Sequence, residues 1–298
     1  MVDPSAHDNA PYTLIGPDRP AVPFVFNVPH AGRYYPPDLL ADTELDLADL
    51  RAMEDCLMDE LVRPAVAHLA PVLINRYARA YVDTNRDHRE LDARIISAKL
   101  PDSRHTLSER VRAGLGVIPA IAGGGRPIYQ RPLPWHRVES RLNRIYHPTH
   151  AALMALVRQT LATFGCTVLV DCHSMPRLPH GLHHMGRSPD VVIGDRHGRS
   201  AGSHVVGAAV AAFKAQGLTV ARNSPYAGGY NAEAYGAPAS GVHALQIEIS
   251  RDLYLNERSL TLHEGAGHMT RTLQAVFDRL YALPLDALRP PALPTAAE

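Results

Sequence analysis

The sequence predicts a single α/β domain built on a central, mostly parallel mixed sheet flanked by helices. Short apolar segments of strand length alternate along the chain with longer segments in which apolar residues recur at helical spacing. The strand-like segments are almost continuously apolar, which is typical of a parallel sheet covered on both faces. A chain of 298 residues with 46% hydrophobic residues is long enough to bury one sizeable core.

The apolar patterns place each element in order along the chain. Helical spacing predicts helices at 45–69, 138–164, 198–216 and 259–280, and Pro64 is expected to bend or break the first of them. We expect strands at 23–28, 72–75, 80–83, 167–170, 191–193 and 243–250. The domain is therefore expected to span residues 12–282, with poorly ordered tails at 1–11 and 283–298.

Charge and cysteine content argue against several classes of protein. The 30 basic residues balance the 30 acidic ones without a one-sided run, so the basic face of a nucleic-acid-binding protein is missing. The three cysteines lack CxxC spacing, which argues against a disulfide framework and for a reducing compartment. No apolar run has signal-peptide or membrane-spanning length. We expect a cytoplasmic protein with no membrane or nucleic-acid partner; the sequence does not indicate the oligomeric state.

Four of the predicted strands run directly into a polar cluster. The clusters begin at His30 and at residues 83–89, 171–174 and 194–197. Ligands of open parallel sheets bind outside the carboxyl ends of the strands, so these clusters are expected to converge on one cleft.

Two strand-end histidines suggest a metal site. His30 and His173 each follow an apolar strand, where a neutral imidazole is held rigidly enough to bind a metal, although polar loop histidines are the ordinary alternative. A catalytic zinc usually takes a third protein ligand, for which Asp55 and Glu54 are candidates. Asp55 and Asp59 are four residues apart, so on a helix they share a face that points either into the cleft or into solvent.

Glu248 and Arg86 are candidates for catalysis and for substrate binding. In the strand at 243–250, Leu245, Ile247 and Ile249 alternate with Gln246, Glu248 and Ser250. A carboxylate on the polar face either meets water or acts as a general base beside the metal. Arg86 beside Asn85 suits a substrate carboxylate, because a guanidinium binds it with two parallel hydrogen bonds. The alternative is an ordinary ion pair with Asp83, Asp87 or Asp92.

Five ordered motifs resemble the N-formylglutamate amidohydrolase family over about residues 25–254. They are NVPHAG (27–32), VDTNRDHRELD (82–92), VDCHSMP (170–176), NSPYAGGYNAEAYG (223–236) and LQIEISRDLYLNE (245–257). That family is similar in turn to zinc carboxypeptidases and related acyl-amino-acid hydrolases. The resemblance implies a zinc-exopeptidase-like fold and zinc-dependent hydrolysis of N-formyl-L-glutamate to formate and glutamate, a step of histidine degradation.

The resemblance also implies roles for individual residues. His30 and His173 would bind Zn²⁺, Glu248 would be the general base, and Asn85 with Arg86 would hold a carboxylate. Carboxypeptidases have a metal-binding Glu three residues after the first histidine, whereas this chain has Arg33, so we take Asp55 as the third ligand. A second carboxylate needs another cation, for which Arg251, Arg222 and Arg196 are candidates. The motif at 223–236 adds Asn223, Gly228 and Gly229 as expected substrate contacts.

Two other functions remain open at this stage. The chain could be a different metal-dependent N-acyl-amino-acid deacylase or a small carboxypeptidase, because the sequence does not show the size of the pocket. A catalytically silent binding protein of the same fold is less favoured, because His30, Arg86, His173 and Glu248 are all present.

Overall fold

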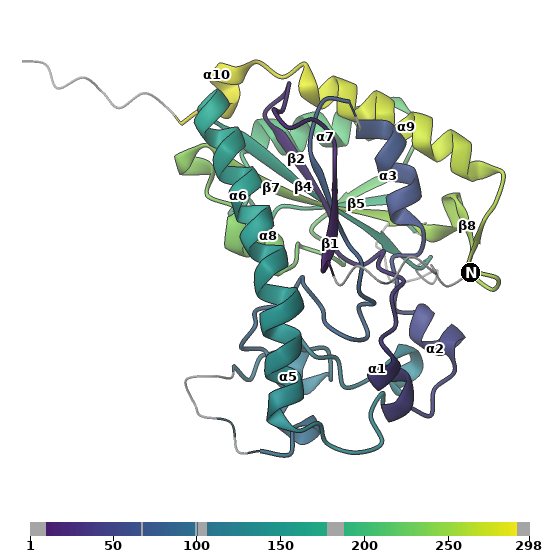
Figure 1. Ribbon diagram of the computed structural model, residues 1–298. Helices are drawn as coiled ribbons and strands as arrows, with labels where there is room; N and C mark the ends of the chain where they lie inside the picture. Colours follow the sequence, from purple (N-terminus) through teal and green to yellow (C-terminus); the bar gives the residue numbers. More distant parts are fainter. Residues whose placement is uncertain (1–9, 67, 99, 101–105, 178–187, 291–298) are drawn as a thin grey trace, which may run out of the picture.

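The computed structural model describes residues 10–290 except 67, 99, 101–105 and 178–187 (Figure 1). Its centre is a mixed sheet with the strand order β1-β3-β2-β4-β7-β5-β6. Strands β3, β2, β4 and β7 are parallel, whereas β1 runs antiparallel to β3 and β5 antiparallel to β7. The fold class predicted from the sequence is confirmed. The strands are β1 (Tyr12–Ile15), β2 (Phe24–Val28), β3 (Val72–Asn75), β4 (Thr167–Met175), β5 (Val191–Gly194), β6 (Val220–Arg222) and β7 (Val242–Ser250).

Helices cover both faces of the sheet. On one face α3, α7 and α9 bury alternate strand residues, and Phe277 of α9 meets Phe26 of β2 edge-on at 4.7 Å between ring centroids. On the other face Val25 and Leu169 pack against Leu153 of α6. The helices are α1 (Pro37–Asp42), α2 (Leu47–Arg51), α3 (Met58–Val66), α4 (Glu109–Arg112), α5 (Trp135–Arg141), α6 (His147–Phe164), α7 (Ser203–Ala215), α8 (Tyr230–Tyr235), α9 (Gly265–Tyr281) and α10 (Leu285–Leu288).

A second apolar core lies below the sheet, among α1, α2, α5 and the loops around them (Figure 1). A π-helical stretch, Leu142–Tyr146, joins α5 to α6, so one long helix runs from this lower core onto the sheet. The guanidinium of Arg141 is fully buried there, 3.8 Å above the centre of the Tyr81 ring, and donates a hydrogen bond to Tyr129 Oη.

The helix predicted at 45–69 is two helices separated by a loop. Helix α2 ends at Arg51 and α3 begins at Met58, so the break precedes Pro64, which lies inside α3. The loop between them is itself buried at its centre, at Glu54, Asp55 and Cys56. Asp55 therefore lies before the helix and does not share a helical face with Asp59.

The strand predicted at 80–83 is a turn. Ala80 and Val82 are apolar because they belong to the lower core, and the amide of Tyr81 bonds to Ala78 O at 2.9 Å. Near the other end of the chain, α9 begins at Gly265 and not at the predicted residue 259, because Thr261–Leu262 form strand β9, which pairs with β8 (Leu255–Asn256) in a hairpin.

The chain ends also differ in part from expectation. The described part of the predicted tail, 283–290, includes α10, whose Leu288 is buried; residues 1–9 and 291–298 lie outside the described part of the chain. The three cysteines are buried and free. Among the helices in the described ranges, none has both the length and the apolar character needed to cross a bilayer.

Candidate active site

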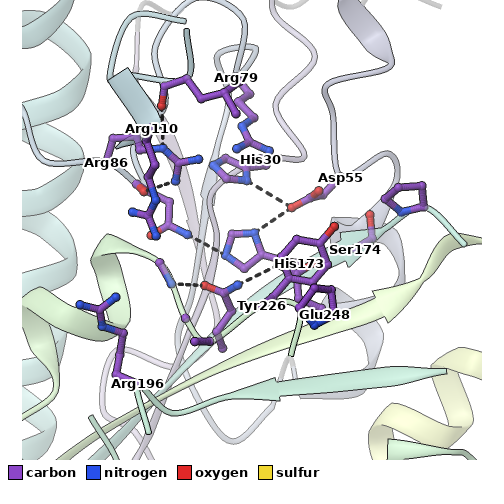
Figure 2. A pocket seen from close by; sticks show the side chains of 18 of the residues that line it. His30, Asp55, Arg79, Arg86, Arg110, His173, Ser174, Arg196, Tyr226 and Glu248 are labelled. Atoms are coloured by element: carbon purple, nitrogen blue, oxygen red, sulfur yellow. Dashed lines mark hydrogen bonds and ion pairs between the residues drawn. The ribbon is translucent and has the colours of Figure 1, made fainter. Parts of the chain in front are cut away.

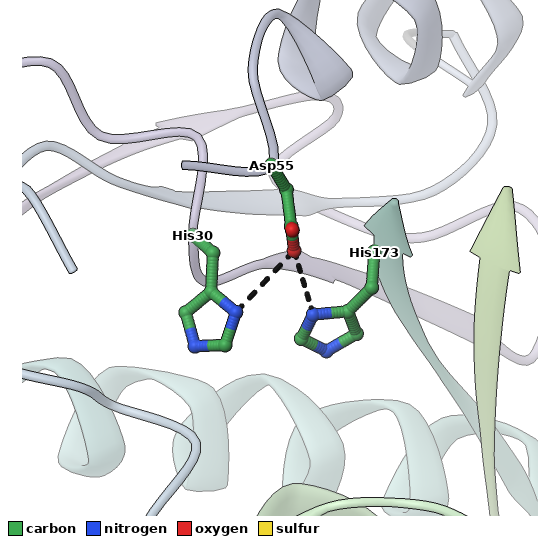
Figure 3. Close-up of side chains that lie close together, drawn as sticks. All are labelled: His30, Asp55 and His173. Atoms are coloured by element: carbon green, nitrogen blue, oxygen red, sulfur yellow. Dashed lines mark hydrogen bonds and ion pairs between the residues drawn. The ribbon is translucent and has the colours of Figure 1, made fainter. Parts of the chain in front are cut away.

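Two histidines and one carboxylate from separate segments meet at the end of the central strands (Figure 3). His30 follows β2, His173 lies on β4, and Asp55 lies in the loop before α3. Asp55 Oδ2 is 2.8 Å from His173 Nδ1 and 3.3 Å from His30 Nδ1, and all three side chains are buried. One nitrogen or oxygen from each lies within 4.8 Å of the others, which is the spacing of ligands around a metal ion.

The outer nitrogens of both imidazoles are held by carboxylates. His30 Nε2 lies 2.7 Å from Asp83 Oδ1, and His173 Nε2 lies 2.8 Å from Asp171 Oδ2. Each Nε2 therefore carries its hydrogen and directs Nδ1 toward Asp55, as in carboxylate–histidine–metal arrangements. His30 Nδ1 is buried without a hydrogen bond. This orphaned nitrogen, and a donor set of two imidazoles and one carboxylate, fit a divalent metal such as catalytic zinc.

Burial and charge pull in opposite directions at the cluster. Burial opposes ionisation of Asp55, but the hydrogen bond from His173 and the nearby imidazole of His30 hold its pKa well below the usual range. Burial also opposes charge on His173, but Asp171 and Asp55 outweigh it and raise the pKa of that imidazole well above its ordinary value. In the absence of metal a proton thus supplies the positive charge that the two carboxylates require.

Glu248 lies beside His173, because the two residues are paired across β4 and β7. Its neighbours Ile247 and Ile249 point into the apolar core, as the alternation predicted. The carboxylate is buried, and its Oε1 accepts a 2.7 Å hydrogen bond from Gln246 Nε2. Burial raises the pKa of Glu248 to about 7 against the opposing positive charge of His173. Such a carboxylate can both accept and return a proton near neutral pH.

A cavity of about 470 Å³ opens over these residues (Figure 2). All four predicted polar clusters contribute side chains to its wall, which confirms the expectation of a single cleft. Asp55 and Glu248 are the acidic residues of the wall. Its arginines are Arg79, Arg86, Arg110, Arg196 and Arg251. The cavity is therefore suited to a small anionic ligand.

Asp83 links the cluster of His30, Asp55 and His173, called here the metal-type cluster, to two arginines of the wall. These are Arg79 and Arg86. Asp83 Oδ1 accepts hydrogen bonds from His30 and from the amide of Asn85, and its Oδ2 accepts one from Arg79 Nε at 2.9 Å. Burial opposes ionisation of Asp83, but the positive charges of Arg86, His30 and Arg79 keep its pKa well below the usual range. One carboxylate thus orients a histidine and an arginine together.

Arg86 is a buried cation with other cations near it. Its Nε donates to Leu115 O at 2.9 Å, and its Nη1 donates to Asn85 O at 2.7 Å. Burial lowers the pKa of Arg86 to about 10, and the charges of Arg79 and Arg110 act in the same direction. Within the part of the chain that the structure describes, the guanidinium of Arg110 has no hydrogen-bond or ion-pair partner. An anion bound here would relieve both the repulsion and the burial of charge.

The long helix formed by α5, the π-helical stretch and α6 holds the backbone of residues 84–86 through two hydrogen bonds. Tyr146, the last residue of the π-helical stretch, donates a 2.6 Å hydrogen bond from its hydroxyl to Arg86 O. One turn later, His150 Nε2 lies 3.0 Å from Thr84 O, and burial lowers the pKa of this histidine to about 4. The neutral imidazole therefore donates to that carbonyl.

Comparison with known proteins places this site in a family. Residues 22–255 match the N-formylglutamate amidohydrolase family. The chain belongs to this family. A crystal structure of N-formylglutamate amidohydrolase from Ralstonia eutropha JMP134 superposes with a TM-score of 0.84 at 32% identity, covering 91% of this chain and 97% of that one.

Two curated relatives agree with this assignment. N-formylglutamate deformylases from Pseudomonas aeruginosa and Pseudomonas putida are each 27% identical, over 81% and 79% of this chain and 85% and 83% of their own lengths. The chain is accordingly an amidohydrolase.

The structure brings most of the predicted site residues of this amidohydrolase to the cavity. His30, Asp55, His173, Glu248, Asn85 and Arg86 all line it, as do Gly228 and Gly229. Glycine is required at position 229, because a Cβ there would lie 2.3 Å from Asn85 Nδ2. The amide of Gly229 donates to Gln246 Oε1 at 2.6 Å, which ties the loop to β7.

Two predicted substrate contacts lie elsewhere. The side chain of Asn223 bonds to Asp195, accepting from its backbone amide at 2.9 Å and donating to its carboxylate. Arg222 is half-exposed and pairs with Asp195 at 3.1 Å. Both residues stabilise the turn after β5, which carries Arg196 to the cavity, and neither belongs to the cavity wall.

The alternative acidic residues also have other partners. Glu54 accepts a 2.6 Å hydrogen bond from Tyr35 Oη, and Asp59 pairs with Arg33 at 2.8 Å on another side of the protein. Of the acidic candidates, only Asp55 faces the two histidines.

Sequence reasoning missed three polar residues of the wall, Arg79, Arg110 and Gln246. Arg79 directly precedes the segment predicted as a strand, and Arg110 lies on a helix of four residues within a long connection. Gln246 was recognised only as part of the alternation around Glu248. Arg79 lies four residues before Asp83, and this spacing is the one signal that could have indicated their ion pair. The spacing brings the two side chains together only in a turn, whereas the apolar pattern predicted a strand.

Proposed function

We propose that this amidohydrolase releases formate from N-formyl-L-glutamate, using a zinc ion held by His30, Asp55 and His173. The observation that carries the proposal is the set of two imidazoles and one carboxylate beside the buried Glu248, at the base of an arginine-rich cavity. The names of the curated relatives support this substrate. The setting in histidine degradation and a cytoplasmic location stay predictions.

Glu248 moves the protons of the reaction. A bound zinc ion would supply Lewis acidity toward the formyl group and toward a water molecule. Glu248, with a pKa raised to about 7 by burial, accepts the proton of the attacking water and returns it to the amide nitrogen as the C–N bond breaks. Arg79, aligned by Asp83, is placed to stabilise the negative charge that develops on the formyl oxygen.

The arginines of the cavity divide between the two carboxylates of the substrate. Arg86 is rigidly held and lies near Arg110, whose guanidinium has no partner among the described residues, so these two form the stronger anion site. Arg196 lines the wall, and its ion pair within the described ranges is with Glu233, at 2.6 Å, whose side chain is 56% exposed. A substrate carboxylate can displace an exposed carboxylate from Arg196 at low cost. We assign Arg86 and Arg110 to the α-carboxylate and Arg196 to the side-chain carboxylate.

A panel of acyl amino acids tests the function. Formate release from N-formylglutamate is compared with release from N-formylglutamine, and with deacylation of N-acetylglutamate and N-succinylglutamate, before and after the metal is removed by a chelator and zinc is restored. We expect the highest kcat/KM for N-formylglutamate and activity that depends on added zinc. Faster turnover of a larger acyl group, or full activity in the metal-free protein, would overturn the proposal.

A further inference from the structure

The third member of the metal-type cluster lies on the least regular of the three segments. His173 is fixed within β4 and His30 lies two residues after β2, but Asp55 lies in a loop whose Leu57 has a positive φ of 58°. A β-carbon makes this backbone conformation unfavourable, so the loop needs support from its surroundings. Ligands on loops are also less precisely placed than ligands on strands.

A turn that follows β7 supplies this support on both sides of Asp55. Arg251 Nη2 donates a 2.6 Å hydrogen bond to Glu54 O, the carbonyl just before Asp55. Tyr254 Oη donates a 3.0 Å hydrogen bond to Cys56 O, the carbonyl just after it. Arg251 is 8% exposed and Tyr254 is fully buried. The turn from Arg251 to Tyr254 therefore holds the backbone of the metal-ligand loop at two peptide units, one on each side of the Asp55–Cys56 peptide.

Arg251 also connects this loop to the strand that carries the second histidine. Its Nε donates to Ser174 Oγ at 3.1 Å, and Ser174 directly follows His173. Its Nη2 lies 3.5 Å from Asp55 Oδ1, while Oδ2 of the same carboxylate faces the two imidazoles (Figure 3). One planar guanidinium thus spans the loop and the strand, which the point charge of a lysine cannot do.

We propose that Arg251 and Tyr254 are positioning residues that hold Asp55 against the two histidines and thereby set the metal affinity of the site. Arg251 had been a candidate for binding a substrate carboxylate, but its hydrogen-bonding groups are already directed to the loop and to Ser174. The inference rests on the metal site of the proposed function and is independent of which amide is hydrolysed.

Zinc binding measured without substrate tests the inference. The purified full-length protein is stripped of metal and titrated with Zn²⁺ against a competing chromogenic chelator. Arg251→Lys keeps the positive charge but loses the planar set of guanidinium donors. We expect it to weaken zinc binding roughly 10- to 100-fold, the range for residues that orient metal ligands. Tyr254→Phe removes one hydrogen bond from a buried carbonyl and should weaken it about threefold to tenfold.

Arg196→Lys is the matched control, because this arginine lines the same cavity and, among the described residues, has no hydrogen bond or ion pair to His30, Asp55 or His173. Its zinc affinity should stay within about twofold of wild type, because the substitution disturbs only an exposed ion pair, which contributes little free energy. Its KM should rise. Arg251→Lys should show the opposite pattern, with a near-normal KM once zinc is saturating and a kcat that recovers as zinc is raised.

The outcomes separate this inference from the proposed function. Wild-type zinc affinity in Arg251→Lys together with a raised KM would make Arg251 a substrate clamp and overturn the inference. A wild-type protein that binds no zinc would overturn the inference and the metal site together. Tight zinc binding without formate release would refute only the substrate. If Arg251→Lys fails to fold by circular dichroism, the zinc affinity of Tyr254→Phe decides.

Discussion

Replacing Glu248 by glutamine tests the proposed chemistry most directly. Glutamine has nearly the shape of glutamate and can still accept the hydrogen bond from Gln246 through its carbonyl oxygen. It cannot accept the proton of a water molecule. The substitution therefore removes the proton-accepting carboxylate from a buried position and leaves the packing of β7 in place.

The expected loss of rate follows from the role of a general base. Such groups contribute about 10²- to 10⁴-fold, so kcat of Glu248→Gln should fall by that factor, or about 2.7 to 5.4 kcal/mol in activation free energy. In the wild type, kcat/KM should decrease tenfold per pH unit below the pKa of Glu248, because the carboxylate must be ionised to act. The acid limb should lie at or below pH 7, since a cation bound nearby lowers a pKa that burial raises to about 7.

Although Glu248→Gln should lower kcat, it should raise the stability of the metal-free protein above neutral pH. Because burial raises the pKa of Glu248 above its ordinary 4.5 in the folded state, the metal-free protein gains stability from this group at low pH. That contribution is lost as the pH rises from about 4.5 through 7, and it amounts to about 3 kcal/mol. Metal-free Glu248→Gln should therefore be more stable than metal-free wild type at pH 8, with the difference shrinking toward pH 5.

Three measurements decide the outcome. Formate is followed with a coupled formate dehydrogenase assay, zinc content by elemental analysis, and stability by urea unfolding at pH 5 and pH 8. Glu257→Gln, an exposed carboxylate between β8 and β9, is the matched control and should behave as wild type. Turnover of Glu248→Gln within tenfold of wild type, with zinc bound, would refute the assignment of Glu248 as the general base.

Three further substitutions give separate predictions. Asp83→Asn should weaken zinc binding about 10- to 100-fold, because it removes the carboxylate that orients His30; an unchanged zinc titration would exclude that role. Arg196→Met should reduce the preference for N-formylglutamate over N-formylglutamine at least tenfold, and equal effects on kcat/KM for the two substrates would show that it does not bind the side-chain carboxylate. Phe277→Ala should destabilise the fold by about 3 to 5 kcal/mol in urea unfolding by removing a ring packed on Phe26, and a loss below 1 kcal/mol would contradict this packing.

The sequence predicted most reliably those elements whose pattern has a single physical cause. The strand at 72–75 is buried on both faces, so its continuous apolar run marked its bounds correctly. The alternation around Glu248 was correct because one face of β7 packs into the apolar core and the other faces the cavity. The turn at 80–83 looked like a strand because it is buried in the lower core, and burial alone does not reveal whether a strand partner exists.

The candidate site was predictable where a residue depends on its local segment and not where it depends on a distant one. His30 follows β2 as predicted, whereas His173 lies within β4, which continues to Met175 beyond the predicted strand at 167–170. The preference for Asp55 over Glu54 could not be derived locally, because it is Tyr35 that draws the Glu54 carboxylate away. Arg110 could not be found for the same reason: its approach to the cavity depends on how a long connection folds back toward the site.

The π-helical stretch between α5 and α6 constrains how this enzyme can change. A π turn accommodates an additional residue compared with an α turn, so deletion of the exposed Asn143 would allow residues 135–164 to wind as one uninterrupted α-helix. The deletion would also rotate one half relative to the other by about 100°. Either Arg141 would leave the ring of Tyr81, or Tyr146 would leave the carbonyl of Arg86. A more regular helix would thus be incompatible with an aligned substrate site, and we expect evolution to tolerate substitutions in this stretch far better than a change in its length.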